Sequence, residues 1–150
     1  MIQRIQTIWW FLIGVFFIVM IPTDWIYFVL DGNSEALLSA NGVSRNGETV
    51  ITGWPLMVYL LGMALFNFAI IFFFKKRILQ SKLTFVSIIL SLGFYAVMYL
   101  YRFLSFQEDV LSADYNWPVI LPLINAILGF MAWRSVLKDE AYVRSLDRLR

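Results

Sequence analysis

The sequence predicts an all-α membrane protein, built as a bundle of four transmembrane helices. Hydrophobic residues make up 61% of the 150 residues and charged residues only 15%, whereas soluble domains are about half apolar and about a quarter charged. The apolar residues fall into four blocks that contain no Asp, Glu or Lys, and most basic residues flank those blocks. An apolar surface divided in this way suits contact with lipid better than a single core shielded from water.

The four blocks divide one domain into spans and loops. A helix needs about 20 apolar residues to cross a hydrocarbon core of about 30 Å, and each block is long enough when its flanking turns are included. Pro55 and Pro118 stand near the starts of the second and fourth blocks, where a missing N–H costs a helix nothing. We expect spans at residues 5–22, 54–74, 83–104 and 117–134, outer loops at 23–53 and 105–116, an inner loop at 75–82 and a tail at 135–150.

The first block is interpreted as a retained helix and not as a secretory signal peptide. It follows a single Arg4, but its apolar run is longer than a signal peptide uses. The sequence Ile21-Pro22-Thr23-Asp24 offers no cleavage site of the small-x-small type.

The charged residues predict the orientation of the bundle. Ten of the twelve basic residues lie on one side of the predicted membrane and seven of the ten acidic residues lie on the other. Cytoplasmic loops are rich in Lys and Arg, so both termini and the inner loop are expected in the cytoplasm. The inner loop would act as the topogenic signal through Lys75, Lys76, Arg77 and Lys82. This account makes a nucleic-acid partner unnecessary.

Two further elements are expected outside the spans. In the first outer loop, Asp31-Gly32 and Asn46-Gly47 are hairpin signals, which predict a small β-ribbon on the outer face. The tail from Arg134 to Arg150 has apolar residues on one helical stripe. It predicts an amphipathic helix, either as a solvated continuation of the fourth span or as a segment that docks on lipid or protein.

Both ends of the chain resemble one protein family. The opening MIQRIQT at residues 1–7, the ending DEAYVRSLDRLR at 139–150 and Trp54-Pro55-Leu56 at the second span are similar to a family of small Bacteroidota membrane proteins that is known only as a domain of unknown function. The resemblance covers the whole chain. It implies four helices and an inner-membrane location in a Gram-negative bacterium, and it implies no activity.

Small and polar residues within the spans are candidates for helix packing. Polar side chains can hydrogen-bond between helices, and small ones let helices approach closely. The candidates are Asn67, Ser87, Ser91, Asn125, Ala126 and Gly129. The alternative is that the polar members line a pocket or that the small faces bind another membrane protein.

Tyr95, Tyr99 and Arg102 are spaced four and three residues apart in the third span, so they are expected on one helical face. The simplest interpretation is an aromatic belt at the membrane interface with an arginine that reaches toward water. These three residues are therefore candidates for contact with lipid headgroups.

The sequence points away from catalysis. It contains no Cys and no His, so the usual ligands for zinc and haem iron and the base of a Ser-His triad are missing. No phosphate-binding or nucleophile-elbow motif occurs. We expect no enzyme activity and no cofactor.

Three hypotheses for the function follow. The leading one is a non-catalytic accessory or structural subunit of a larger inner-membrane assembly, whose partners are the lipid bilayer and other membrane proteins or further copies of the chain. The second is a small oligomeric transporter or channel subunit, in which Asn67, Asn125 and Tyr95 would face a water-filled path. The third is a lipid-binding membrane protein that uses Arg102.

Overall fold

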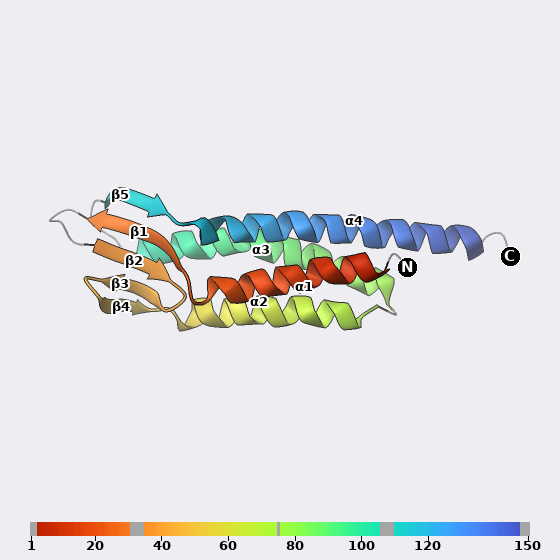
Figure 1. The fold of residues 1–150 in the computed structure, drawn as a ribbon, viewed down its shortest axis with the longest axis horizontal. Coiled ribbons are helices and arrows are strands. Elements are labelled where there is room, and N and C mark those ends of the chain that lie inside the picture. The colour runs from red at the N-terminus through yellow and green to blue at the C-terminus, as the bar shows by residue number, and fades with distance from the viewer. Residues whose placement is uncertain (1–2, 31–34, 75, 106–109, 148–150) are drawn as a thin grey trace.

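The computed structural model describes residues 3–30, 35–74, 76–105 and 110–147, and the side chains of residues 3–5 and 143–147 are not described. The molecule is elongated, with helices lying side by side along its length and a β-sheet at one end (Figure 1). The helices are α1 (Gln3–Met20), α2 (Trp54–Phe72), α3 (Arg77–Ser105) and α4 (Leu121–Asp147), and the short 3-10 helix η1 (Trp117–Ile120) leads into α4.

The prediction of an all-α bundle is wrong, because the structure contains a five-stranded antiparallel sheet. Its strands are β1 (Asp24–Leu30), β2 (Glu35–Ser39), β3 (Gly42–Arg45), β4 (Glu48–Thr52) and β5 (Val110–Tyr115), in the order β4-β3-β2-β1-β5. The expected ribbon in the first outer loop is therefore a four-stranded meander. The second expected outer loop, at 105–116, contributes the fifth strand.

The fifth strand explains why local sequence signals underestimated the sheet. An isolated two-stranded hairpin is marginal in water, and a stable sheet needs more strands or a helix to pack on. β5 supplies part of that support by pairing with β1, with Ala113 opposite Phe28. Three strands and two helices separate β1 from β5 in the chain. Local sequence patterns therefore cannot predict that these two strands pair.

Three helical segments are long and apolar enough to cross a membrane: Trp54–Phe72, Arg77–Ser105 and Trp117–Tyr142. The described apolar part of α1, Gln6–Met20, is shorter. α3 begins inside the segment expected as an inner loop, and α4 continues without interruption through the expected tail to Asp147. Of the predicted apolar stripe in the tail, Val136 is buried and Tyr142 is exposed. The side chains of Val143 and Leu146 lie outside the described residues, as do residues 148–150.

Each helix turns one stripe of residues toward its neighbours. On α2 the buried residues are Leu56, Leu60, Met63, Ala64, Asn67 and Ile70, at helical spacing. The buried stripe of α3 changes character along its length: Gln80, Ser81, Thr84, Ser87 and Ser91 come first, and Phe94 and Met98 follow. The face that α3 turns inward is therefore polar over its first half and apolar toward the sheet.

Aromatic packing attaches the sheet to the helices. Trp25 of β1 is fully buried and meets Phe94 of α3 edge to face, with ring centroids 5.4 Å apart. Its indole N–H donates to the main-chain carbonyl of Met20, at 3.0 Å. These contacts of Trp25 hold the first strand against α3.

Two glycines allow the sheet to meet the start of α2. Gly53 donates its N–H to the carbonyl of Asn41, at 2.8 Å. A Cβ added to Gly53 would lie 2.1 Å from the nitrogen of Gly42, and Gly42 itself has a φ of +113°. Position 53 therefore requires glycine, because any side chain there would collide with the main chain of residues 40–42.

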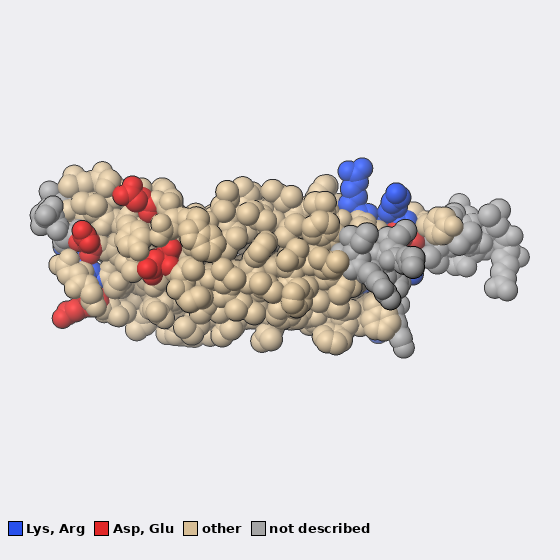
Figure 2. All heavy atoms as spheres, viewed as in Figure 1, with Lys and Arg blue, Asp and Glu red and all other residues tan. Residues whose placement is uncertain are grey.

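The two ends of the molecule carry opposite charge (Figure 2). We call the end with the strands the sheet end, where Asp24, Glu35, Glu48 and Asp114 lie. We call the other the basic end, and its described cations are Lys76, Arg77, Lys82, Arg134 and Lys138. The surface between the two ends is formed mainly by uncharged residues, which suits a membrane-spanning segment.

Candidate functional sites

The middle of the bundle contains a hydrogen-bonded polar pair. Asn67 of α2 is fully buried, and its Oδ1 accepts a hydrogen bond from the Ser87 hydroxyl of α3, at 2.8 Å. The Asn67 amide donates in turn to the carbonyl of Met63, at 2.8 Å. Ser91, also buried, donates to the carbonyl of Ser87. The structure therefore brings three of the expected packing residues together between α2 and α3.

Asn125 of α4 differs from Asn67. Its side chain is 1% exposed, yet neither atom of its amide has a hydrogen-bond partner among the described residues. One turn further along α4, a Cβ added to Gly129 would lie 2.8 Å from Cγ1 of Ile88, so α3 and α4 approach closely there. Ala126 is also buried. All six expected packing residues thus lie inside the protein, but Asn125 is not joined to the Asn67 pair by a hydrogen bond.

A second polar cluster at the basic end was missed by the sequence analysis. The Gln6 amide of α1 donates to Oδ2 of Asp139, at 2.6 Å, and to the Ser135 hydroxyl, at 3.2 Å, and both acceptors belong to α4. Gln80 of α3 donates to the carbonyl of Ile70 near the end of α2. The only signal in the sequence is a glutamine near the starts of α1 and α3, which does not reveal that segments of four helices converge.

The cluster surrounds a cavity of about 250 Å³. Trp10 is buried at its wall and donates its indole N–H to the Thr84 hydroxyl, at 3.2 Å. Arg77, Asp139, Gln6 and Gln80 line it together with apolar residues. Arg77 Nη1 lies 3.5 Å from the main-chain carbonyl oxygen of Asp139. This cavity therefore combines a cation, a carboxylate and two amides at the level of the basic end.

The three interface candidates of α3, Tyr95, Tyr99 and Arg102, have different surroundings. The Tyr95 hydroxyl points inward and donates to the carbonyl of Val119 in η1, at 2.7 Å, whereas Tyr99 is 67% exposed. The guanidinium carbon of Arg102 lies 5.9 Å from the centroid of the Phe28 ring, within the range of a cation–π contact. The structure therefore places Arg102 against the sheet.

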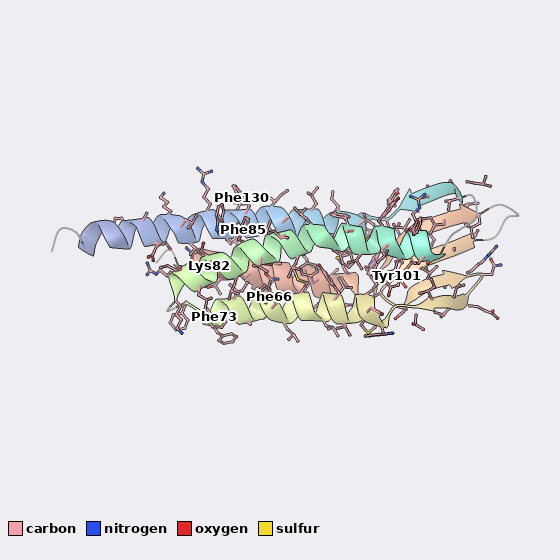
Figure 3. The ribbon with its side chains drawn as sticks, turned by 180° about the vertical axis from the view of Figure 1, so that it is seen from behind. Phe66, Phe73, Lys82, Phe85, Tyr101 and Phe130 are labelled. Carbon is pink, nitrogen blue, oxygen red and sulfur yellow. The ribbon has the colours of Figure 1, made fainter. Side chains whose placement is uncertain are left out.

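Of the expected topogenic residues, Arg77 and Lys82 lie in the first turns of α3 and Lys76 directly precedes it. Lys76 and Lys82 are exposed and Arg77 is half-buried beside the cavity; Figure 3 shows Lys82 near the basic end. Lys75 lies outside the described residues. Arg77 thus differs from Lys76 and Lys82, because it lines the cavity formed by the polar cluster.

The sheet carries one perturbed titratable group. The hydroxyl of Tyr27 hydrogen-bonds to Oδ2 of Asp24, at 3.2 Å. This bond raises the pKa of Tyr27 above its ordinary value of 10.0, and repulsion between the carboxylate and a phenolate adds to the effect. Among the residues that the structure describes, His, Cys, Asp and Glu form no group of three that could hold a metal ion.

Comparison with known proteins identifies a family but no activity. No curated protein and no solved structure matches the chain. One family matches residues 2–149, and its description is Domain of unknown function (DUF4293). Because that match covers nearly the whole sequence, the chain belongs to this family.

Proposed function

We propose that the protein is a non-catalytic subunit of an assembly in the bacterial inner membrane, where its helices anchor the sheet and its sheet end contacts a second integral membrane protein. The observation that carries the proposal is a group of exposed apolar side chains at the sheet end. On the last turns of α3, Tyr99, Phe103 and Leu104 are 67%, 68% and 60% exposed. On β5, Leu111 and Tyr115 are 65% and 62% exposed.

The exposed apolar residues at the end of α3 lie at the level of the sheet. The Tyr101 hydroxyl donates to the carbonyl of Thr52, at 3.5 Å, so this level of α3 lies beside the last residue of β4. The last turn of α3, to which Phe103 and Leu104 belong, therefore extends past the start of α2 and lies beside the sheet (Figure 3). Exposed apolar residues beside a sheet mark a surface for contact with another protein or with a membrane.

The same surface favours a membrane-embedded partner over a soluble one. Exposed apolar residues continue along α3 toward the basic end, including Leu92, Ile89 and Phe85. A partner that covers Phe103 can thus remain beside α3 within the bilayer. β5 is also an edge strand of the sheet, and an open edge offers main-chain groups to a second chain.

The charge distribution supports the orientation that goes with this proposal. The basic end carries the described lysines and the sheet end carries most of the acidic residues. By the positive-inside rule the basic end would face the cytoplasm. Both termini would then be cytoplasmic, and the sheet would stand on the opposite side of the membrane.

The non-catalytic part of the proposal is supported by residue chemistry. The sequence lacks Cys and His, and in the described ranges the carboxylates do not converge on one site. A transporter built on Asn67, Asn125 and Tyr95 has less support, since Asn67 and Tyr95 bond within one chain. Lipid binding by Arg102 also has less support, because its guanidinium lies over Phe28.

Site-specific photo-crosslinking in cells tests the proposal. A photoreactive residue at Phe103 is expected to give one discrete protein adduct, whereas the same residue at Phe130, which is 50% exposed on α4, is expected to give none. Phe103→Glu should abolish co-purification of that partner. Val50→Glu, at an exposed position of β4 on the other sheet edge, should preserve it.

Two results would contradict the proposal. One is a lone monomer after extraction in a gentle detergent that preserves other membrane complexes, combined with no adduct at Phe103. The other is an adduct pattern at Phe130 identical to that at Phe103, because this would report random collisions along the lipid-facing surface.

A further inference from the structure

We infer that the cavity at the basic end binds a zwitterionic group with a phosphate and a primary ammonium, supplied by the headgroup of phosphatidylethanolamine. The cavity lies among the starts of α1 and α3, the end of α2 and the later part of α4, and its volume is about 250 Å³. This inference does not depend on the partner proposed for the sheet end.

The first support is the separation of opposite charges within the cavity. Arg77 and Asp139 both line it, but Arg77 reaches Asp139 only through the main-chain carbonyl, at a long 3.5 Å. A guanidinium has five N–H donors, so most of those of Arg77 remain available to a ligand. Two charges of opposite sign that do not neutralise each other are suited to a ligand that carries both.

The second support is the way the carboxylate is held. Oδ2 of Asp139 accepts the Gln6 amide, at 2.6 Å, and Gln6 is 4% exposed. This bond fixes the orientation of the carboxylate and leaves its other oxygen to accept a hydrogen bond from an ammonium. Gln80, which is also 4% exposed, is fixed by its bond to the carbonyl of Ile70. The walls of the cavity are thus held in place without a ligand.

The third support is the chemistry of the remaining wall. A phosphate ester accepts paired hydrogen bonds from a guanidinium, and Arg77 is the first residue of α3, where the helix dipole adds positive character. Trp10 and Phe74 provide aromatic surface beside these groups. Because a trimethylated ammonium cannot donate a hydrogen bond, the carboxylate should favour a primary amine.

The location identifies the source as lipid. Phe74 is 54% exposed, and its neighbours Phe72 and Phe73 are 78% and 38% exposed. Phe72 ends a helical segment that is long and apolar enough to cross a membrane, and Phe73 and Phe74 follow it. Acyl chains can therefore lie against these rings while the headgroup enters the cavity. The exposed Lys76, Lys82 and Lys138 place the same level at the polar boundary of the bilayer.

Native mass spectrometry of protein released from nanodiscs tests the inference. Nanodiscs of phosphatidylcholine are doped with equal amounts of phosphatidylethanolamine and phosphatidylglycerol. Wild-type protein is expected to retain phosphatidylethanolamine in preference to both other lipids. Arg77→Gln should lower its retention about tenfold, as expected for the loss of charge-assisted hydrogen bonds.

A second variant tests the carboxylate. Asp139→Asn keeps an oxygen that accepts the Gln6 hydrogen bond, so the wall is preserved. It should remove the preference for phosphatidylethanolamine and raise the relative retention of phosphatidylglycerol, because the negative charge that repels an anionic lipid is gone. Lys138→Gln, at an exposed neighbouring position of α4, is the matched control and should leave the preference unchanged.

Several results would overturn the inference. Equal retention of the three lipids by wild-type protein would show that the cavity does not select a headgroup. Stronger retention of phosphatidylglycerol would indicate general attraction to basic residues, and so would an equal effect of Lys138→Gln and Arg77→Gln. Thermal stabilisation by soluble phosphoethanolamine, without any by phosphatidylethanolamine, would assign the cavity to a soluble ligand.

Discussion

The Ser87 hydroxyl of α3 donates a 2.8 Å hydrogen bond to the amide oxygen of Asn67 in α2, and both side chains are buried. This bond links two helices in the middle of the bundle, where water cannot replace it. Interhelical hydrogen bonds in membrane proteins contribute about 0.6 kcal/mol on average, and a buried group that loses its partner costs about 1–3 kcal/mol.

Ser87→Ala is therefore expected to lower the free energy of unfolding in detergent by about 1–2 kcal/mol. The Asn67→Leu, Ser87→Ala double variant should lose less than the sum of the two single variants, because it leaves no orphaned partner. Thermal or denaturant unfolding followed by circular dichroism measures both. Ser112→Ala, on the exposed surface of β5, is the control and should have little effect on the free energy of unfolding. If the losses of the two single variants simply add in the double variant, Asn67 and Ser87 do not interact.

Asn125 is predicted to respond in the opposite direction. Its amide is buried without a hydrogen-bond partner in the described part of the chain, so it loses nothing when an apolar residue of similar volume replaces it. Asn125→Leu should leave the unfolding temperature unchanged or raise it, whereas Asn67→Leu should lower it. The same unfolding assay compares the two, and equal destabilisation would show that the Asn125 amide stabilises the fold as much as the Asn67 amide does.

Trp25 is predicted to be the main attachment of the sheet. It is fully buried, packs on Phe94 and donates to the carbonyl of Met20. Trp25→Ala should cost about 3–5 kcal/mol, as is usual for removing a large buried aromatic residue. Limited proteolysis should then cleave the strands before the helices lose their structure. Trp54→Ala removes the same side chain at a position that is 68% exposed, and an equal loss there would refute the assignment.

The pair Tyr27 and Asp24 predicts a pH dependence at the sheet end. The hydrogen bond stabilises the neutral phenol and raises the pKa of Tyr27. Its contribution to stability is therefore complete below the ordinary phenol pKa of about 10, and it is lost as the pH rises through the raised value. The difference between the ultraviolet titrations of wild type and Tyr27→Phe isolates this group. Asp24→Asn should lower the pKa of Tyr27 toward its ordinary value. Glu48→Gln, which removes a different exposed carboxylate of the sheet, should leave the pKa of Tyr27 unchanged.

Local patterns in the sequence predicted most of the helical part of the fold. Apolar blocks and flanking prolines located α2 and η1 to within a few residues, because a membrane-spanning segment must be apolar along its whole length. They did not predict that α3 begins at Arg77. The helical course of α4 to Asp147 agrees with one of the two alternatives that the apolar stripe of the tail left open, a continuation of the fourth span. Helix ends depend on local backbone bonding in polar segments, for which hydropathy carries little information.

The sites were predicted less completely than the helices. Asn67, Ser87 and Asn125 stood out because polar residues are rare in apolar blocks, and all three are buried. Gln6, Gln80 and Asp139 did not stand out, since polar residues near helix ends are common. Their convergence depends on how three helices pack, which is a long-range property.

By itself the sequence determined that this chain has segments apolar enough to cross a membrane, where those segments begin, and which end carries the positive charge. These properties depend on residue type and order alone, because hydration of a side chain is a local quantity. Only the tertiary structure decided that the two outer segments join in one five-stranded sheet, that Trp25 faces Phe94, and that Arg77 and Asp139 share a cavity. Each of these is a contact between residues far apart in the chain. Such a contact contributes interaction energy only after folding has brought the two residues together.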